Sequence, residues 1–165
     1  MSNPQISLRT ATLADVPVLQ SWESLPHVID SSPNETIDWK FELEHAGSWV
    51  QHLIADLDDV PIGIIQIIDP YEEPSHYWGE VEQNLRAIDI WIGPAEYLGK
   101  GHGTVMMRQA IELCFANPEV TAILIDPLAT NTRAIKFYRT LGFGEVGLRW
   151  FDEDHCLVMR LERDK

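Results

Sequence analysis

The feature that most constrains the fold of this chain is the glycine-rich loop at residues 98–104, Leu-Gly-Lys-Gly-His-Gly-Thr. Glycines at alternate positions let a backbone turn tightly and approach a ligand without interference from Cβ atoms. Apolar residues follow at i, i+3, i+4 and i+7, a spacing that predicts one face of a helix: Met107, Ala110, Ile111 and Cys114. A glycine loop that opens a helix gathers free N–H groups and the positive end of the helix dipole at one point. The segment therefore predicts an anion site, most naturally for phosphate, with a plain structural turn as the alternative.

Two common phosphate-binding loops do not fit this segment. A nucleotide-triphosphate loop ends in Gly-Lys followed by Ser or Thr, and this loop does not. A dinucleotide fingerprint needs an early strand before the loop and an acid about twenty residues after it. Here the preceding predicted strand, residues 85–92, lies in the middle of the chain, and the next acids, Glu112 and Glu119, fall in or just after the helix. A different phosphate ligand is therefore indicated.

The hydrophobic pattern of the whole chain predicts an α+β fold. Strands are predicted at residues 6–8, 49–56, 62–68, 85–92, 122–126, 144–151 and 155–161. Helices are predicted from Thr12 or Asp15, at 36–45, from the glycine loop to Phe115, and at 131–141, with the rest of 24–48 irregular. Antiparallel strands followed by a strand–helix–strand–helix unit predict one domain over residues 1–165, with a mixed, largely antiparallel sheet flanked by helices. The long acidic and aromatic loop at 69–84 is a candidate functional loop.

The composition is that of an ordinary globular protein, with 45% hydrophobic and 23% charged residues. No apolar run approaches the roughly eighteen residues that a membrane span needs, and the first residues, Met-Ser-Asn-Pro, do not form a signal peptide. The two cysteines, Cys114 and Cys156, show no metal-ligand spacing, and Cys114 falls on the apolar helix face. We therefore expect a cytoplasmic protein with reduced thiols, no metal and no membrane contact.

The formal charge of −14 is unevenly distributed along the chain. Residues 1–85 contain fifteen acids against Arg9 and Lys40, a charge of −13, whereas residues 86–165 contain ten Lys or Arg and eleven acids, a charge of −1. This asymmetry suits an enzyme with an anionic cofactor and a cationic substrate, although a solubilising surface is the alternative. Nucleic acid is disfavoured as a partner, because phosphate backbones require clustered basic residues.

A second motif begins about thirty residues after the glycine loop, at Asn131, and reads Asn-Thr-Arg-Ala-Ile-Lys-Phe-Tyr, with Leu-Gly-Phe at 141–143. Asn131 is a good helix N-cap, and Asn131, Ala134 and Tyr138, at i, i+3 and i+7, share one helical face. Together with the glycine loop, this motif resembles the GNAT superfamily of acetyl-CoA-dependent N-acetyltransferases. The resemblance extends over most of the chain and is most specific over residues 89–143.

The resemblance implies a splayed sheet that binds acetyl-CoA without a metal. In this family the glycine loop holds the pyrophosphate of coenzyme A, the residue at Asn131 orients the pantetheine arm, and the residue at Tyr138 gives its proton to the departing thiolate. A half-buried tyrosine bonded to a carbonyl is the alternative for Tyr138. The implied cofactor-binding residues are Trp91, Ile92, Leu98, Gly99, Lys100, Gly101, His102, Gly103, Thr104, Asn131, Ala134 and Tyr138.

Two acids are candidates for the acceptor side of the reaction. Asp89 lies inside an apolar strand, where burial of a carboxylate costs free energy unless the group is paired or has a function. Asp126 ends the strand at 122–126. Amide formation requires an amine that has lost its proton, and a nearby carboxylate can accept that proton directly or through water. A buried hydrogen-bonding acid or a turn former is the alternative for each.

Within the superfamily, the segments around Asp89, the glycine loop and Asp126 look similar to the aminoglycoside 6′-N-acetyltransferase branch. In that branch, acids at these two positions contact the polycationic sugar. Trp22 and Trp78 match aromatic residues of its acceptor pocket, although a role in the core is equally consistent with Trp22.

We therefore predict acetyl transfer to a primary amine of a cationic small molecule, with Asp89 and Tyr138 as the catalytic residues. No histidine pairs with a cysteine or serine, so direct attack without an acyl-enzyme is expected. The predicted substrate-binding residues are Trp22, Trp78, Asp89 and Asp126. The alternatives are another acceptor (a siderophore precursor, a polyamine or a protein N-terminus) and a non-catalytic acyl-CoA-binding module. Monomer and homodimer both remain open.

Overall fold

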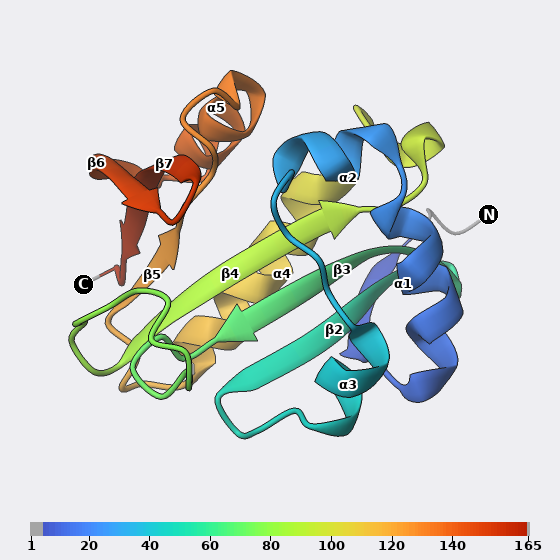
Figure 1. The fold of residues 1–165 in the computed structure, drawn as a ribbon, viewed down its shortest axis with the longest axis horizontal. Coiled ribbons are helices and arrows are strands. Elements are labelled where there is room, and N and C mark those ends of the chain that lie inside the picture. Colours follow the sequence, from blue (N-terminus) through green and yellow to red (C-terminus); the bar gives the residue numbers. More distant parts are fainter. Residues whose placement is uncertain (1–4, 165) are drawn as a thin grey trace.

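The computed structural model describes residues 5–164, and its centre is a mixed sheet of seven strands (Figure 1). The strands are β1 (Ile6–Thr10), β2 (Val50–Leu57), β3 (Val60–Ile68), β4 (Leu85–Ile92), β5 (Ala122–Ile125), β6 (Gly144–Phe151) and β7 (Asp154–Glu162). Their order across the sheet is β1-β2-β3-β4-β5-β7-β6, and only the β4–β5 pair is parallel. The predicted α+β fold is confirmed, with every predicted strand present.

Helices cover both faces of the sheet (Figure 1). They are α1 (Val16–Glu23), α2 (Pro26–Ser31), α3 (Trp39–Glu44), α4 (His102–Ala116) and α5 (Thr132–Thr140), with short 3-10 turns at Leu13–Asp15 and Ala95–Tyr97. The first three helices lie on one face, and α4 lies behind β3 and β4 on the other. Each layer follows from the alternation of side chains along the strands, since neighbouring residues point to opposite faces.

The structure corrects the prediction for the segment 24–48 at two points. Residues 26–31, predicted to be irregular, form α2, which begins at Pro26. Proline disrupts a helix only after its first turn, and its fixed φ favours the first position, so Pro26 starts this helix. The helix predicted at 36–45 is shorter, because Asp38 caps α3 by accepting a hydrogen bond from the Phe41 N–H.

The two strands at the middle of the sheet separate after a short pairing. β4 pairs with β5 only from Leu85 to Ala87, whereas β4 itself continues to Ile92. Beyond β5 the chain stays beside β7, where the Leu157 N–H donates to the Pro127 carbonyl. The sheet therefore opens between β4 and β5, as the family resemblance implied.

Three buried clusters pack around this sheet. The largest lies between the strands and α4 and includes Ile65, Ile88 and Met107. On the opposite face, Leu19, Trp22 and Trp39 belong to a cluster beneath α1 and α3. A third cluster, which includes Trp78 and Phe151, lies on β4, β5 and β7 near the opening. Cys114 and Cys156 are both buried and unpaired, as predicted for Cys114.

Candidate active site

The site begins with a break in the apolar pattern of one sheet face. On β4, Ala87 belongs to one apolar cluster and Trp91 packs against another, and Asp89 lies between them on the same face. On β3, Gln66 is the residue directly opposite Asp89. Polar side chains therefore separate the two clusters, and the surface between them is hollow rather than packed.

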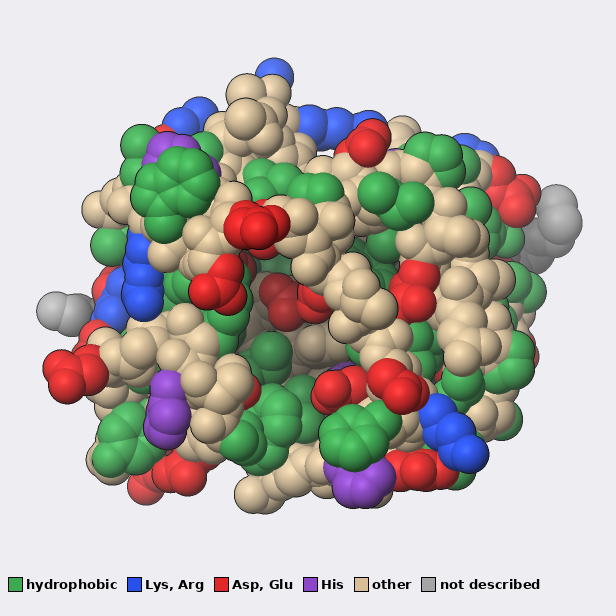
Figure 2. Space-filling model, in the orientation of Figure 1, with side chains coloured by type: hydrophobic (Ala, Val, Ile, Leu, Met, Phe, Trp, Pro, Cys, Tyr) green, Lys and Arg blue, Asp and Glu red, His purple; other side chains and the backbone are tan. Residues whose placement is uncertain are grey.

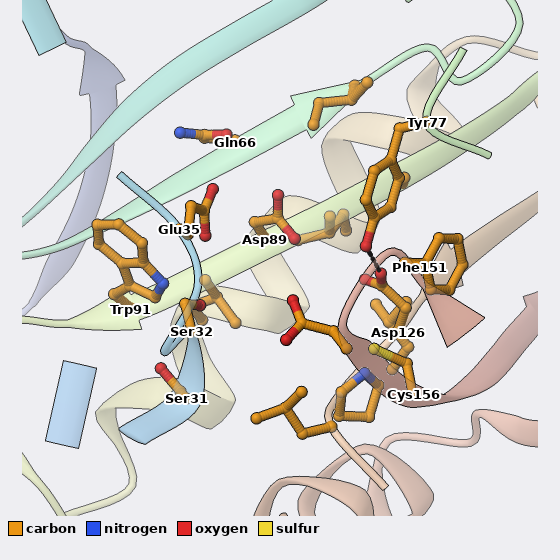
Figure 3. A pocket seen from close by; sticks show the side chains of 18 of the residues that line it. Ser31, Ser32, Glu35, Gln66, Tyr77, Asp89, Trp91, Asp126, Phe151 and Cys156 are labelled. Carbon is orange, nitrogen blue, oxygen red and sulfur yellow. Dashed lines mark hydrogen bonds between the residues drawn. The ribbon is translucent and has the colours of Figure 1, made fainter. Parts of the chain in front are cut away.

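Asp126 occupies the position on the β5 side that corresponds to Asp89. The last paired residues are Ala87 and Leu124, and each acid lies two residues further along its strand direction. Because side chains alternate, two residues further means the same face of the sheet. The diverging strands thus carry one carboxylate each at the mouth of the opening (Figure 3). The placement of the two acids at this opening explains why Asp89 interrupts one apolar strand and Asp126 follows the end of another.

A cleft of about 820 Å³ surrounds the two acids. Its walls come from four segments: residues 31–37 between α2 and α3, part of the 69–84 loop, the turn between β6 and β7, and the start of α5. Asn34 donates to the Asp154 carboxylate at 2.7 Å, so the first wall touches the β6–β7 turn across the cleft. Figure 2 shows the resulting hollow, with acidic side chains in and around it.

The charge of this cleft is one-sided. Within residues 5–164, the side chains that line it include eight carboxylic acids and no Lys, Arg or His. The acids are Glu35, Glu42, Glu73, Asp89, Asp126, Asp152, Glu153 and Asp154. Carboxylates gathered without cationic partners repel each other, so a ligand with several positive charges would bind with a strong electrostatic gain.

Burial and mutual repulsion raise the pKa values of the central acids. Asp89 faces the water of the cleft but is enclosed by protein, and this desolvation, with the nearby Asp126 carboxylate, raises its pKa to about 7. Burial also raises the pKa of Asp126, although a hydrogen bond from the Tyr77 hydroxyl opposes the rise. Glu35 lies opposite Asp89 (Figure 3), and burial followed by the Asp89 charge raises its pKa to about 7.

The face of α5 that was predicted to meet a ligand lines the same cleft. Asn131 caps the helix by accepting a hydrogen bond from the Ala134 N–H at 3.1 Å, as predicted. Asn131, Ala134 and Tyr138 all line the cleft. Burial, followed by the charges of Asp89 and Asp126, raises the pKa of the Tyr138 phenol. The phenol therefore stays protonated at neutral pH and is able to act as a proton donor.

The glycine loop lies beside the same end of β4. Gly99 (φ 71°) and Gly101 (φ 83°) adopt left-handed conformations, and an added Cβ at either position would meet no atom within 4 Å. This is an open turn, because backbone conformation rather than crowding requires glycine at these positions. Gly101 caps α4, and a Cβ at Gly103 would lie 3.6 Å from both Ile92 of β4 and Phe137 of α5. The loop, β4 and α5 thus meet at one place, with the free N–H groups of the first helical turn.

The remaining predicted residues separate into two groups. Trp78 is buried (4% exposed) and lines the cleft, and the Trp91 side chain lines the cleft rather than the glycine loop. Trp22 is 3% exposed and packs in the cluster beneath α1, against Gly93, so packing accounts for it. Lys100 is exposed, and the His102 ring lies edge-on to Tyr97.

Several residues that line the cleft were not predicted from the sequence, among them Glu35, Gln66 and Tyr77. Gln66 was detectable, since it is the single polar residue in the apolar run 62–68. Glu35 and Tyr77 lie in segments without periodicity, and no local pattern points to them. In residues 5–164, no three His, Cys, Asp or Glu side chains are arranged to hold a metal ion.

Comparison with known proteins identifies the family. The acetyltransferase (GNAT) domain family matches residues 11–151, which include both the glycine loop and the α5 motif. The chain belongs to the GNAT acetyltransferases. The aminoglycoside N(6′)-acetyltransferase type 1 of Klebsiella pneumoniae is 32% identical over 155 residues, which span 88% of this chain and 77% of that protein.

Two solved structures are similar to this GNAT protein over most of its length. The crystal structure of the aminoglycoside acetyltransferase AAC(6′)-Ib in complex with coenzyme A and kanamycin matches with a TM-score of 0.86 and 31% identity, over 96% of this chain and 95% of that chain. An uncharacterised protein of Bacillus halodurans matches with a TM-score of 0.87 and 25% identity, over 97% and 85% of the two chains. The fold and the family resemblance drawn from the glycine loop and the Asn131 motif are thus confirmed.

Proposed function

We propose that this acetyltransferase moves the acetyl group of acetyl-CoA to a primary amine of a polycationic aminoglycoside, as its relatives' names indicate for the 6′ amine. The observation that carries the proposal is the cleft of residues 5–164 that is lined by eight acids and by Tyr138, with no cationic side chain. Neutral or anionic acceptors would leave these carboxylates unpaired, whereas a sugar with several ammonium groups would neutralise them.

The residues around the loop fit acetyl-CoA as the donor. The left-handed Gly99 and Gly101 and the N-terminus of α4 supply N–H groups suited to a pyrophosphate. Within residues 5–164, β4 pairs with no strand on its β5 side beyond Ala87. His27 Nε2 donates to the Ile92 carbonyl at 2.9 Å, and the rest of this stretch of backbone is open to hydrogen-bond an extended arm. Asn131 and Ala134 line the cleft beside that edge. The donor supplies a thioester whose acetyl carbon an amine can attack.

In this arrangement the protein's own groups manage two protons. Asp89, with a pKa near 7, accepts the proton that the attacking amine loses, directly or through water. Tyr138, protonated at neutral pH, gives its phenolic proton to the sulfur as the C–S bond breaks. Asp126 binds an ammonium group of the acceptor. In balance, one N–H and one C–S bond break and one C–N and one S–H bond form. Asp89 ends protonated and Tyr138 deprotonated, and proton transfer between them through water restores both.

Cys156 lines the cleft and is the obvious candidate for an acyl-enzyme. Burial, followed by the charge of Asp126, raises the pKa of its thiol to about 12, so almost no thiolate is present at neutral pH. Direct attack by the amine is therefore the proposed route. Incubation with acetyl-CoA alone, followed by intact-protein mass spectrometry, should show no added acetyl group.

The two buried, unpaired cysteines suit a reducing compartment, and the cytoplasm is part of this proposal. None of the helices in residues 5–164 is long and apolar enough to cross a bilayer.

The acceptor proposal is tested by thiol release with kanamycin, spermidine and a peptide with a free N-terminus. Kanamycin should give the highest kcat/KM, and NMR of the product should locate the acetyl group on the 6′ amine. The KM for kanamycin should rise with salt much more than the KM for acetyl-CoA, since exposed acids around the cleft are screened beyond about 8 Å at 0.15 M salt. A preference for spermidine or the peptide, or equal salt slopes for both KM values, would refute the polycationic acceptor. Binding of acetyl-CoA without release of thiol by any amine would indicate a non-catalytic module.

A further inference from the structure

Tyr77, in the 69–84 loop, makes a hydrogen bond to one of the two central acids. Its hydroxyl donates to the Asp126 carboxylate at 2.5 Å (Figure 3). Residues 69–84 contain no helix or strand. Side-chain contacts, rather than regular backbone structure, must therefore fix the position of the Tyr77 hydroxyl. The two residues are 49 positions apart in the chain.

The Tyr77 ring is held in place by its neighbours. It stacks on Phe151 with centroids 4.6 Å apart and planes 8° from parallel, and it meets Trp78 edge-on at 5.6 Å. Its backbone N–H donates to the Glu73 carboxylate at 3.0 Å. Arg149 lies 4.6 Å from the centroid of Phe151 and donates to the Trp78 carbonyl, which ties the loop to β6. These contacts fix the ring although 45% of the residue is exposed.

Asp89 and Asp126 differ in their hydrogen bonds, because Asp126 accepts one from a side chain and Asp89 does not. They occupy corresponding positions on the diverging strands, and both are enclosed by protein. Asp126 accepts the Tyr77 hydrogen bond, whereas desolvation and the charge of Asp126 alone act on Asp89. A hydrogen bond to a carboxylate favours its charged form and fixes its orientation.

We propose that Tyr77 is a positioning residue that keeps Asp126 ionised and directed into the cleft as the ammonium-binding group, which leaves Asp89 to accept the proton. This inference rests on the proposed function, and it assigns different roles to two acids at corresponding positions on the diverging strands. The groups that face Asp126 from the surrounding elements carry no positive charge: Glu35, Asp89, Tyr138, Asp154 and Cys156. The Tyr77 hydroxyl, followed by the backbone N–H of Asp126 itself, therefore offsets their repulsion.

The decisive variant is Tyr77→Phe, which keeps the ring and its stacking on Phe151 and removes only the hydroxyl. Tyr71→Phe is the matched control, because Tyr71 lies exposed in the same loop and does not line the cleft. Without the hydroxyl, the pKa of Asp126 rises, so Asp126 is protonated over a wider pH range and binds cations less well. We expect the KM for kanamycin to rise about tenfold, with kcat within about twofold of the wild-type value. The acidic limb of the kcat/KM profile should move to higher pH, and Tyr71→Phe should change neither quantity.

A double-mutant cycle separates positioning from a general structural effect. If Tyr77 acts through Asp126, adding Tyr77→Phe to Asp126→Asn should change kcat/KM by less than about twofold. An equal loss in both backgrounds would overturn the proposal, as would an unchanged pH profile in Tyr77→Phe.

A carboxyl ¹³C NMR titration of the free protein measures the Asp126 pKa without any reaction. It should be higher in Tyr77→Phe than in the wild type and the control, and an unchanged pKa would refute the role of Tyr77. Inactivity of the wild type toward kanamycin would instead refute the proposed function, while the titration would still decide whether Tyr77 keeps Asp126 ionised.

Discussion

Replacing Asp89 with asparagine should abolish most of the activity and stabilise the fold. The change is nearly isosteric, so it removes charge from the cleft without altering its shape. Asp89 lies beside Asp126 and is desolvated, and both effects disfavour its ionised form in the folded protein. A carboxylate at the catalytic position therefore costs folding free energy at neutral and alkaline pH, as functional sites often do.

The sign of the pH dependence follows from the raised pKa. In the folded protein Asp89 titrates near pH 7, against 3.8 for an unperturbed aspartate, so between these values the folded state binds more protons than the unfolded state. The free energy of unfolding contributed by this group is then fully present below about pH 4 and is lost as pH rises through 7. Asparagine does not titrate, so Asp89→Asn should exceed the wild type in stability at pH 8 and approach it at pH 5.

The expected magnitude is modest because Asp89 remains open to the water of the cleft. We expect a screened gain of about 1 kcal/mol at pH 8, which raises Tm by about 2–4 °C in a domain of this size. Thermal unfolding of wild type, Asp89→Asn and the exposed control Asp30→Asn at pH 5 and pH 8 measures it. A lower Tm for Asp89→Asn at pH 8, or an equal gain in the control, would refute the reasoning. Loss of kcat by at least about a hundredfold is expected in parallel, since general bases contribute about 10²–10⁴-fold.

Two further variants test the donor side. Tyr138→Phe should lower kcat by about tenfold or more while the KM for acetyl-CoA stays nearly constant, because it removes a proton donor rather than a binding contact. An unchanged kcat under conditions where chemistry is rate-limiting would exclude Tyr138 from the mechanism. Gly101→Ala should weaken acetyl-CoA binding and lower stability by about 1–2 kcal/mol, because the left-handed φ of 83° is strained for alanine although the space is open. Calorimetry with coenzyme A and thermal unfolding measure these effects, and Gly144→Ala, at an extended position outside the loop, is the control.

The sequence predicted the elements with strong local signals. The β4 strand, the glycine loop and the Asn131 cap each depend on residues within a few positions of one another, so pattern and capping rules find them. α2 lies in a segment predicted to be irregular, because proline usually interrupts a helix, whereas Pro26 is the first residue of this one.

The site was predictable only where a polar residue interrupted an apolar strand. Asp89 and Gln66 both give such a signal, and the prediction included only Asp89. Tyr77 meets Asp126 across 49 positions and Asn34 meets Asp154 across 120, and contacts of that separation depend on how loops fold over the sheet. Local propensity carries no information about them. The same reason applies to Trp22, for which the sequence allowed either a substrate-binding role or a role in the core. The family pattern identifies an aromatic residue but not the direction of its side chain, and in the structure this side chain lies in a buried cluster.

The acidity of the cleft has a different origin from the one that the uneven charge of the chain suggested. Residues 1–85 contain fifteen acids, yet only Glu35, Glu42 and Glu73 among them line the cleft. The other five lining acids come from the nearly neutral half, at positions 89, 126 and 152–154. Over residues 86–164 the basic side chains do not line the cleft. Arg160, for example, donates to Glu82, and Arg163 donates to the Val120 carbonyl. Local placement by the diverging strands and the β6–β7 turn, rather than the net charge of a segment, therefore creates the cation-binding surface, and the excess acids of residues 1–85 mostly face solvent.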